Sequence, residues 1–244
     1  MTSFRPIMRM QWKHLLFVHW PIPVEIMRPL IPACFEVDTF DDQAWVGLVP
    51  FTMRDVSPVG LPRVPWRGVT DFHECNVRTY VRFGEEVGVY FFSLDAASRL
   101  GVWGAKTFFH LPYKNARISL HRHGESIDYR VDRLDPPRAT MHCRWSVGEP
   151  LPRSQPGELP HFLTERYQLM TTDRAGQPRR CRIAHDLWPL RAAQLVELND
   201  ELVAAAGLQV PSSPPLVHHV DHIDVRAGRL ETLRKPDGTS EGVG

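Results

Sequence analysis

The chain has few lysines and few cysteines. Lysine occurs only at positions 13, 106, 114 and 235, and the other basic residues are arginines. A reaction that needs a lysine amine must therefore use one of four residues. The four cysteines lie far apart and form no Cys-x-x-Cys pair, which argues against a zinc knuckle or a redox dithiol. A disulfide framework is not expected in a chain of 244 residues.

Several other signals are missing. The longest apolar stretch near the N-terminus, LLFV, is too short for a signal peptide or a membrane span, so a cytoplasmic protein with no membrane partner is expected. The net charge of +1 gives no reason to expect a nucleic-acid partner. The sequence contains no Gly-x-Ser-x-Gly, Gly-x-Gly-x-x-Gly or Walker motif, so no serine nucleophile and no cofactor are indicated.

Short extended segments dominate what is present. Strands are expected at 43–56, 74–83, 89–96, 103–113, 116–124, 126–134 and 139–148, separated by turns rich in proline and glycine. Helices are expected at 23–32, 160–170 and 189–208, the last because Leu195, Val196 and Leu198 fit a helical spacing. This pattern predicts a mainly β fold, an antiparallel barrel or sandwich with peripheral helices. One domain over residues 1–230 and a flexible tail over 231–244 are expected.

The stretch DFHECNVRTYVRF, residues 71–83, carries the main candidate site. Alternation along a strand puts Glu74, Asn76 and Arg78 on one face. The following strand, VYFFSLDA, is apolar on both faces, so Phe91 and Phe92 are both expected to be largely buried. A polar row beside such a strand favours a cavity lining over a solvated face, because buried charges need a partner or a ligand. The alternative is a solvated face bearing a Glu–Arg pair.

Histidines raise the question of a metal. They gather in LHRHG, residues 120–124, and HHVDH, residues 218–222, and imidazole suits several transition metals. His123 and Gly124 form an expected turn that would expose the first group. Exposed or hydrogen-bonded histidines are therefore favoured, and no metal site is expected.

Several runs of the sequence are distinctive, among them FHECNVRTYV, GVYFFSLDAAS, FFHLPYKNA, HFLTERYQL and LWPLRAA. They resemble the YqjF-like family of uncharacterised proteins, which is grouped in the acetoacetate decarboxylase-like superfamily. The resemblance covers roughly residues 10–225. It implies an antiparallel conical β-barrel with a closed cavity and a few peripheral helices.

The resemblance also implies a site. In the decarboxylases, a glutamate at the position like Glu74 projects into the cavity, and a lysine forms a Schiff base with a β-keto acid. In LPYKNA, Tyr113 stands where that lysine would be, and Lys114 matches a second lysine. A step of one residue turns a side chain to the opposite face of a strand, so Lys114 should point away from where Tyr113 points. The arginine that holds the substrate carboxylate has no counterpart around His19 and Trp20.

The functional hypothesis is a cavity that binds a small organic acid or carbonyl compound, with lyase, hydratase or isomerase chemistry that uses no Schiff-base lysine. Two alternatives stay open: a non-catalytic binding or sensing protein, and a purely structural Glu74–Arg78 pair. A homo-oligomer is also open, since the decarboxylases often oligomerise. The candidate catalytic residues are Glu74 and Tyr113. The candidate ligand-binding residues are Asn76, Arg78, His19, Trp20, Lys106 and Lys114.

Overall fold

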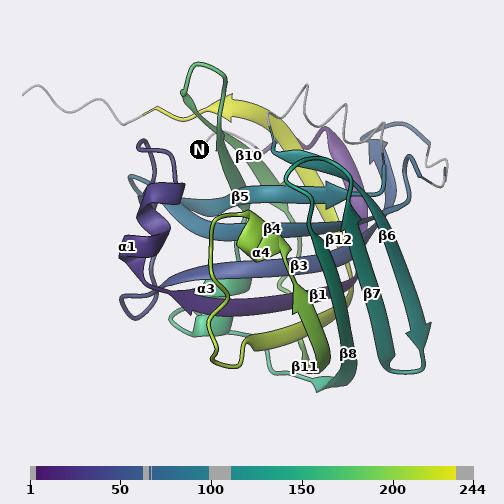
Figure 1. Cartoon of the computed structure of the whole chain (residues 1–244). Helices are drawn as coiled ribbons and strands as arrows, with labels where there is room; N and C mark the ends of the chain where they lie inside the picture. The colour runs from purple at the N-terminus through teal and green to yellow at the C-terminus, as the bar shows by residue number, and fades with distance from the viewer. Residues whose placement is uncertain (1–3, 63–65, 67, 99–110, 235–244) are drawn as a thin grey trace, which may run out of the picture.

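The computed structural model describes residues 4–62, 66, 68–98 and 111–234, and the fold is mainly β. The strands are β1 (Met8–Ile22), β2 (Glu36–Val37), β3 (Ala44–Pro58), β4 (Phe72–Phe83), β5 (Glu86–Ala96), β6 (Tyr113–His123), β7 (Ser126–Arg133), β8 (Thr140–Pro150), β9 (Gln168–Thr172), β10 (Pro178–Ala184), β11 (Arg191–Asp200) and β12 (Leu216–Thr232). Short helices lie at the periphery (Figure 1): α1 (Val24–Met27), the 3₁₀ turn η1 (Arg28–Leu30), α3 (Leu159–Thr164) and α4 (Leu202–Ala205).

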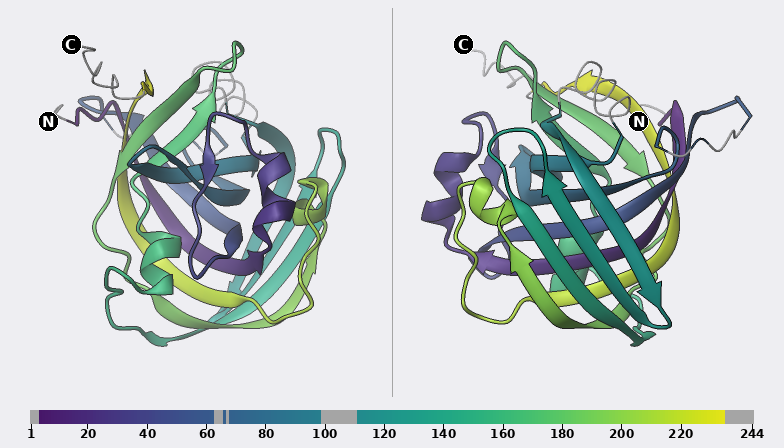
Figure 2. Two further views of the ribbon diagram at one scale, coloured as in Figure 1. Left: turned by 90° about the vertical axis from the view of Figure 1, so that its left-hand side faces the viewer. Right: turned by 45° about the vertical axis from the view of Figure 1, so that its right-hand side comes forward.

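All strands belong to one sheet that curls back on itself (Figure 2). The order is β10-β9-β5-β6-β7-β8-β11-β12-β1-β3-β4-β2, with further pairings of β10 with β12 and of β5 with β4. These pairings join β1, β3, β4, β5, β9, β10 and β12 into a closed ring. Most neighbours are antiparallel, but β5 runs parallel to both β6 and β9.

Strand β4 is covered on both faces, because it lies between this ring's interior and the main hydrophobic core. Cys75 and Val77 face the core, where Tyr129 of β7 and Trp145 of β8 also pack; all four are fully buried. Apolar burial on this scale is the main stabilising term for such a sheet. The alternate residues of β4 face the other way, into the space that the ring encloses.

The helix expected at 189–208 is wrong for most of its length. Residues Arg191–Asp200 form β11, which pairs with β8, and only Leu202–Ala205 are helical. The register shifts between Leu195 and Glu197, which leaves Val196 in a bulge, 56% exposed. Leu195 and Leu198 both pack against the core as a result. The bulge produces a spacing of three residues that resembles a helical pattern.

The other two helices are found in part. The expected helix at 23–32 corresponds to α1 and η1. The one at 160–170 is α3, after which the chain becomes extended and enters β9. At the C-terminus, β12 continues to Thr232 and the Leu233 side chain is buried. Of the tail expected at 231–244, residues 235–244 lie outside the described residues. No helix in the described part of the chain is long and apolar enough to span a membrane.

Strand β5 also departs from simple alternation. Val77 pairs with Ser93 but Arg78 pairs with Phe91, so Phe92 is an extra residue in β5. Phe91 and Leu94 consequently face the ring's interior together, which strict alternation would not allow. Phe91 and Phe92 were both expected to be largely buried. In the structure both residues are half-buried.

Candidate functional site

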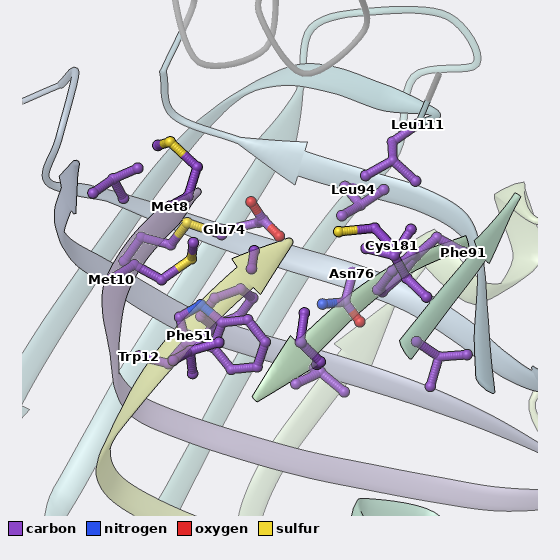
Figure 3. A pocket seen from close by; sticks show the side chains of 18 of the residues that line it. Met8, Met10, Trp12, Phe51, Glu74, Asn76, Phe91, Leu94, Leu111 and Cys181 are labelled. Atoms are coloured by element: carbon purple, nitrogen blue, oxygen red, sulfur yellow. The ribbon is translucent and has the colours of Figure 1, made fainter. Parts of the chain in front are cut away.

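A partly open cavity of about 760 Å³ lies inside the ring (Figure 3). Its lining is mostly apolar. Met8, Met10 and Trp12 of β1 lie on one side, and Phe91, Leu94 and Cys181 lie on the other. Cavities of this size with a few placed polar groups are typical of small-molecule sites.

The polar row of β4 lies in this lining, as three alternate residues of one strand face. Glu74, Asn76 and Arg78 all line the cavity, and their side chains are 1%, 5% and 8% exposed. The strand holds them in register, since Glu74 lies opposite Phe51 and Arg78 lies opposite Gly47 on β3. The stick view shows Glu74 and Asn76 between the two apolar sides (Figure 3).

Glu74 is bonded to Tyr113, the first residue of β6. The Tyr113 hydroxyl donates to Glu74 Oε2 at 3.1 Å. Burial raises the pKa of Glu74 to about 8, the bond from Tyr113 lowers it, and the nearby Asp95 raises it. Burial and the Glu74 charge hold the pKa of Tyr113 well above its usual range. At neutral pH the pair is therefore a largely protonated carboxyl group beside a neutral phenol.

Arg78 and Asn76 keep unused hydrogen-bonding capacity. Arg78 Nη2 donates a long bond to Leu163 O at 3.4 Å, and its Nε is buried without a partner. The guanidinium lies 5.1 Å from the centre of the Phe17 ring. Within the described residues, no carboxylate forms an ion pair with Arg78. Asn76 Oδ1 is likewise buried without a partner.

The Glu74–Arg78 ion pair of the structural alternative is not found in the described part of the chain. The two groups have separate surroundings, with Glu74 bonded to Tyr113 and Arg78 to a carbonyl oxygen. Neither charge is neutralised by the other, and both side chains line the cavity.

A second arginine in the lining, Arg166, is already paired. Its Nη1 donates to Asp38 Oδ2 at 2.7 Å, and its guanidinium lies 5.0 Å from the centre of the Tyr80 ring. A buried arginine paired in this way has its charge balanced. Arg179 and Arg229 also line the cavity; Arg179 pairs with Asp173 at 3.4 Å, and Arg229 is exposed. Arg78 is the lining arginine that is buried without a carboxylate partner among the described residues.

His19 is fully buried but is not part of the lining. Its Nε2 lies 2.8 Å from the Tyr80 hydroxyl, which donates to Leu163 O at 2.7 Å. Burial first, and then the charge of Arg78, hold the His19 pKa well below its usual range. His19 is thus a neutral group that fixes Tyr80 behind Arg78. The Gly47 backbone allows this approach, because a Cβ there would meet the His19 ring at 3.0 Å.

Two other predicted ligand-binding residues, Trp20 and Lys114, lie away from the cavity. Trp20 is 1% exposed within the main core, away from the cavity lining. Lys114 turns away from Tyr113, and its Nζ donates to Pro136 O at 2.8 Å. Lys106 lies outside the described residues.

The part of the cavity lining that β1 contributes was not predicted from the sequence. In MRMQWK, residues 8–13, apolar side chains alternate with polar ones, and Met8, Met10 and Trp12 all line the cavity. The alternation is the signal that could have predicted this face. Cys181 was also missed, although Cys181 and Ile183 alternate with Arg180 and Arg182 on β10 and both line the cavity. Arg166 was missed too, and it follows α3 in a segment with no such alternation.

A buried ion pair lies on the face of β5 that points away from the cavity. Arg133 donates to both oxygens of Asp95, at 2.6 and 2.7 Å, and to Ser93 Oγ at 2.8 Å. Arg133 and Asp95 are 2% and 0% exposed. Ser93 and Asp95 face away from the cavity because the bulge at Phe92 has changed the parity of β5. The pair ties β5 to β7 beside the strand that carries Glu74.

The histidine groups have ordinary surroundings. His121 and His123 are exposed. His219 accepts a bond from Trp145 Nε1 at 3.3 Å and lies 3.3 Å from Asp221 Oδ1. In residues 4–62, 66, 68–98 and 111–234, no cluster of three or more histidine, cysteine, aspartate or glutamate side chains could hold a metal ion.

Comparison with known proteins identifies the family. A family model described as "Uncharacterized conserved protein", DUF2071, matches residues 9–224. The chain belongs to this family. The protein "Uncharacterized protein YqjF" of Bacillus subtilis (strain 168) is 39% identical over 220 residues, which cover 90% of this chain and 89% of that protein. The resemblance to the YqjF-like proteins is thereby confirmed.

Solved structures share the DUF2071 chain's fold. The acetoacetate decarboxylase of Legionella pneumophila matches with a TM-score of 0.66 at 13% identity, over 96% of this chain and 92% of that one. The enduracididine biosynthesis enzyme MppR, complexed with pyruvate, matches with a TM-score of 0.64 at 12% identity, over 96% and 92%. An acetoacetate decarboxylase-like enzyme from Sphingomonas wittichii RW1 matches with a TM-score of 0.59 at 10% identity, over 95% of each chain. At these identities the likeness shows an acetoacetate decarboxylase-like fold.

Proposed function

We propose that this DUF2071 protein binds a small organic acid or carbonyl compound in its cavity and that Glu74 exchanges a proton with it. The observation that carries the proposal is the Glu74 carboxyl group, fully buried in an apolar lining, bonded to Tyr113 and with its pKa raised to about 8. An acid–base group is most effective when its pKa lies near the working pH. Glu74 meets that condition in a way that an exposed glutamate does not.

Arg78 is the proposed anion-binding group. A buried guanidinium normally has a carboxylate partner, and Arg78 has none among the described residues. A ligand carboxylate would supply the missing charge and could accept two parallel bonds from the planar guanidinium. Arg78 lines the cavity and is 8% exposed.

The expected chemistry is proton transfer next to a carbonyl group, as in lyases, hydratases and isomerases. Above its pKa, Glu74 can take a proton from the carbon next to the carbonyl, and the Tyr113 hydroxyl can then bond to the developing oxyanion. This chemistry needs no lysine amine, in keeping with a tyrosine at position 113 and with the bond of Lys114 to Pro136. We also propose that the sheet is a conical barrel and that the cavity is the interior of that barrel. A pyruvate complex of MppR, a protein with this fold, supports a small acid as the ligand.

The test is hydrogen–deuterium exchange of 2-oxo acids, followed by ¹H NMR in D₂O. The wild-type protein is expected to replace the protons next to the carbonyl with deuterium, at a rate that rises as the pH passes about 8. Glu74→Gln should abolish the exchange, because an amide cannot take the proton. Glu85→Gln is the matched control, since Glu85 is exposed in the β4–β5 hairpin.

A non-catalytic binding or sensing role is the second candidate, and the largely apolar lining favours it. Its signature is a ligand that raises the melting temperature of the protein while the wild type and Glu74→Gln exchange protons equally slowly. A ligand present at one hundred times its Kd would add about 2.7 kcal/mol to the free energy of unfolding. No exchange and no stabilisation with any small acid would contradict both candidates.

A further inference from the structure

We infer that an anionic ligand enters the cavity past Arg229, and that this arginine attracts the negative charge at the opening before the ligand reaches the polar row of β4. The inference rests on the proposed function. It adds an entry route and a residue that selects anions through the rate of association. Three features of the structure around β12 lead to it: the exposure of Arg229, its direction, and the distribution of charge.

The exposure of the lining places the opening. The polar row of β4 is buried, whereas Arg229 is exposed, and no other lining residue in the described part of the chain is exposed. Ala227, two residues earlier on β12, is half-buried and lies opposite Met8, another half-buried residue of the lining. A side chain that both lines a cavity and contacts bulk water lies where the two meet. Arg229 therefore lies at the opening.

A bulge in β12 directs Arg229 toward the cavity. Cys181 of β10 pairs with Leu230 and Ile183 pairs with Ala227, so β12 has two residues between these pairs where β10 has one. Arg229 and Leu230 consequently both line the cavity, although they are adjacent on one strand. Simple alternation would have turned one of them to the outer face.

Two contacts of Gly228 hold this bulge. A Cβ at Gly228 would meet the Phe4 ring at 3.2 Å, so the absence of a side chain lets that ring pack against the strand. The Gly228 carbonyl oxygen accepts a hydrogen bond from Cys181 Sγ at 3.4 Å. The direction of Arg229 is therefore fixed by packing and by a hydrogen bond of the backbone next to it.

The nearest carboxylate of the strand lies on the other face of the sheet. Glu231, two residues after Arg229, forms ion pairs with Arg180 at 3.3 Å and with Arg182 at 3.8 Å. Both of these arginines alternate along β10 with residues that line the cavity, so the ion pairs lie on the outer face. Among the described residues, no carboxylate forms an ion pair with Arg229.

The charge of the lining is consequently positive. Four arginines line the cavity, and two of them, Arg166 and Arg179, are paired with aspartates. The carboxyl group of Glu74 is largely protonated at neutral pH, because its pKa is about 8. Arg78 inside the cavity and Arg229 at the opening are left without a balancing charge. Clefts lined by one sign of charge focus the electric field and speed the arrival of ligands of the opposite sign.

The experiment measures the association rate constant, kon, by stopped-flow fluorescence for two dyes with the same ring system. Anilinonaphthalene sulfonate is an anion, and N-phenylnaphthylamine is its uncharged analogue; both become fluorescent in apolar surroundings. For the wild type, kon of the sulfonate should fall as the ionic strength rises from about 10 mM to about 150 mM, because the screening length shortens from about 30 Å to about 8 Å. The uncharged dye should show no such dependence.

Charge reversal at the opening is the decisive variant. Arg229→Glu should lower kon of the sulfonate roughly three- to tenfold at low ionic strength, while its koff and the kon of the uncharged dye stay within about twofold. Arg226→Glu is the matched control, because Arg226 is exposed on the same strand, lies opposite Arg9 and is not part of the lining. Both variants have the same net charge, so a difference between them reports where the charge lies.

A further variant tests the route itself. Ala227→Trp places a large side chain beside the opening and should lower kon of both dyes by a similar factor, because a steric obstacle does not depend on charge. Its melting temperature shows whether it is folded. If it is not, Arg229→Gln, at an exposed site, keeps the inference testable and should give an effect between those of the wild type and Arg229→Glu.

The outcomes separate this inference from the proposed function. Equal kon of the sulfonate in Arg229→Glu and Arg226→Glu, or equal slowing of both dyes by Arg229→Glu, overturns the capture of anions by Arg229. Unchanged rates in a folded Ala227→Trp overturn the position of the opening, and so does failure of the wild type to bind either dye. None of these results affects the Glu74-dependent deuterium exchange, which tests the proposed function.

Discussion

The Tyr113 hydroxyl donates to the Glu74 carboxyl group at 3.1 Å across 39 positions of sequence. Two opposing effects meet in this contact. Burial raises the pKa of Glu74, and the hydrogen bond lowers it, with the result near 8. Because the result lies within an accessible pH range, both effects can be measured separately.

Glu74→Gln should stabilise the protein at alkaline pH. In the unfolded chain Glu74 ionises near 4.5, whereas in the folded protein it stays protonated until about 8. The folded state therefore binds one more proton between these values, and the free energy of unfolding falls as the pH rises through that window. The full effect is on the order of 5 kcal/mol above pH 8. A glutamine cannot ionise and escapes this loss.

Urea unfolding of the wild type and of Glu74→Gln from pH 5 to pH 9 would measure this pH-dependent difference in the free energy of unfolding. The variant and the wild type should be similar at pH 5, with a difference in favour of the variant that grows up to about pH 8 and then stays constant. Asp200, whose pKa is also raised by burial, to about 6, affects both proteins equally. A difference that does not vary with pH would show that Glu74 titrates normally.

Tyr113→Phe should raise the pKa of Glu74 further. The phenylalanine keeps the ring but removes the bond that lowers this pKa. The midpoint of Glu74 ionisation, followed by ¹³C NMR of labelled glutamate side chains, should therefore move upward from about 8. The free energy of unfolding should drop by about 1 kcal/mol at neutral pH, the usual value of one buried hydrogen bond. An unchanged midpoint would mean that the bond does not form in solution.

Asp95→Ala should be strongly destabilising. It leaves the Arg133 guanidinium, 2% exposed, without its carboxylate. Breaking a buried pair from one side lowers stability by about 3–5 kcal/mol. Asp132→Ala is the matched control, because its pair with Arg117 is exposed and worth at most about 1 kcal/mol. Similar values from urea unfolding of the two variants would contradict the buried bidentate pair.

Borohydride treatment in the presence of acetoacetate should leave Lys114 unmodified. Its amine donates to Pro136 O and lies away from Tyr113, so a Schiff base there would require the β6 strand to change register. Peptide mass spectrometry would detect an adduct. A covalent product on Lys114 would reinstate a decarboxylase-like mechanism at that residue, and one on Lys106 would identify a relocated nucleophile that Lys106→Met should abolish.

The sequence predicts the β4 face well, because β4 pairs with β3 without a bulge. Simple alternation is then sufficient to group Glu74, Asn76 and Arg78. Simple alternation fails on β5 and β11, because Phe92 and Val196 are extra residues in these two strands. Such bulges depend on the partner strand, and a single sequence does not contain that information. The helix expected at 189–208 fails for the same reason.

The partner of Glu74 could be anticipated only through the resemblance. Tyr113 is brought to Glu74 by the parallel pairing of β5 with β6, which no local pattern encodes. The lack of a carboxylate partner for Arg78 among the described residues could not be predicted either, because its neighbours Phe17 and Leu163 come from distant segments. Ion-pair partners of this kind are decided by tertiary packing.

The pairing of β1 with β12 has a consequence for how the protein is made. Met8 lies opposite Ala227, and the two strands stay in register along most of β1. In a nascent chain, β1 therefore cannot pair with β12 until the whole segment between them has been synthesised. Contacts so distant in sequence slow folding and prolong the exposure of apolar strands. Until β12 arrives, the cavity has no wall at Val225 and Ala227, and a bound ligand would favour the completed chain over its late folding intermediates.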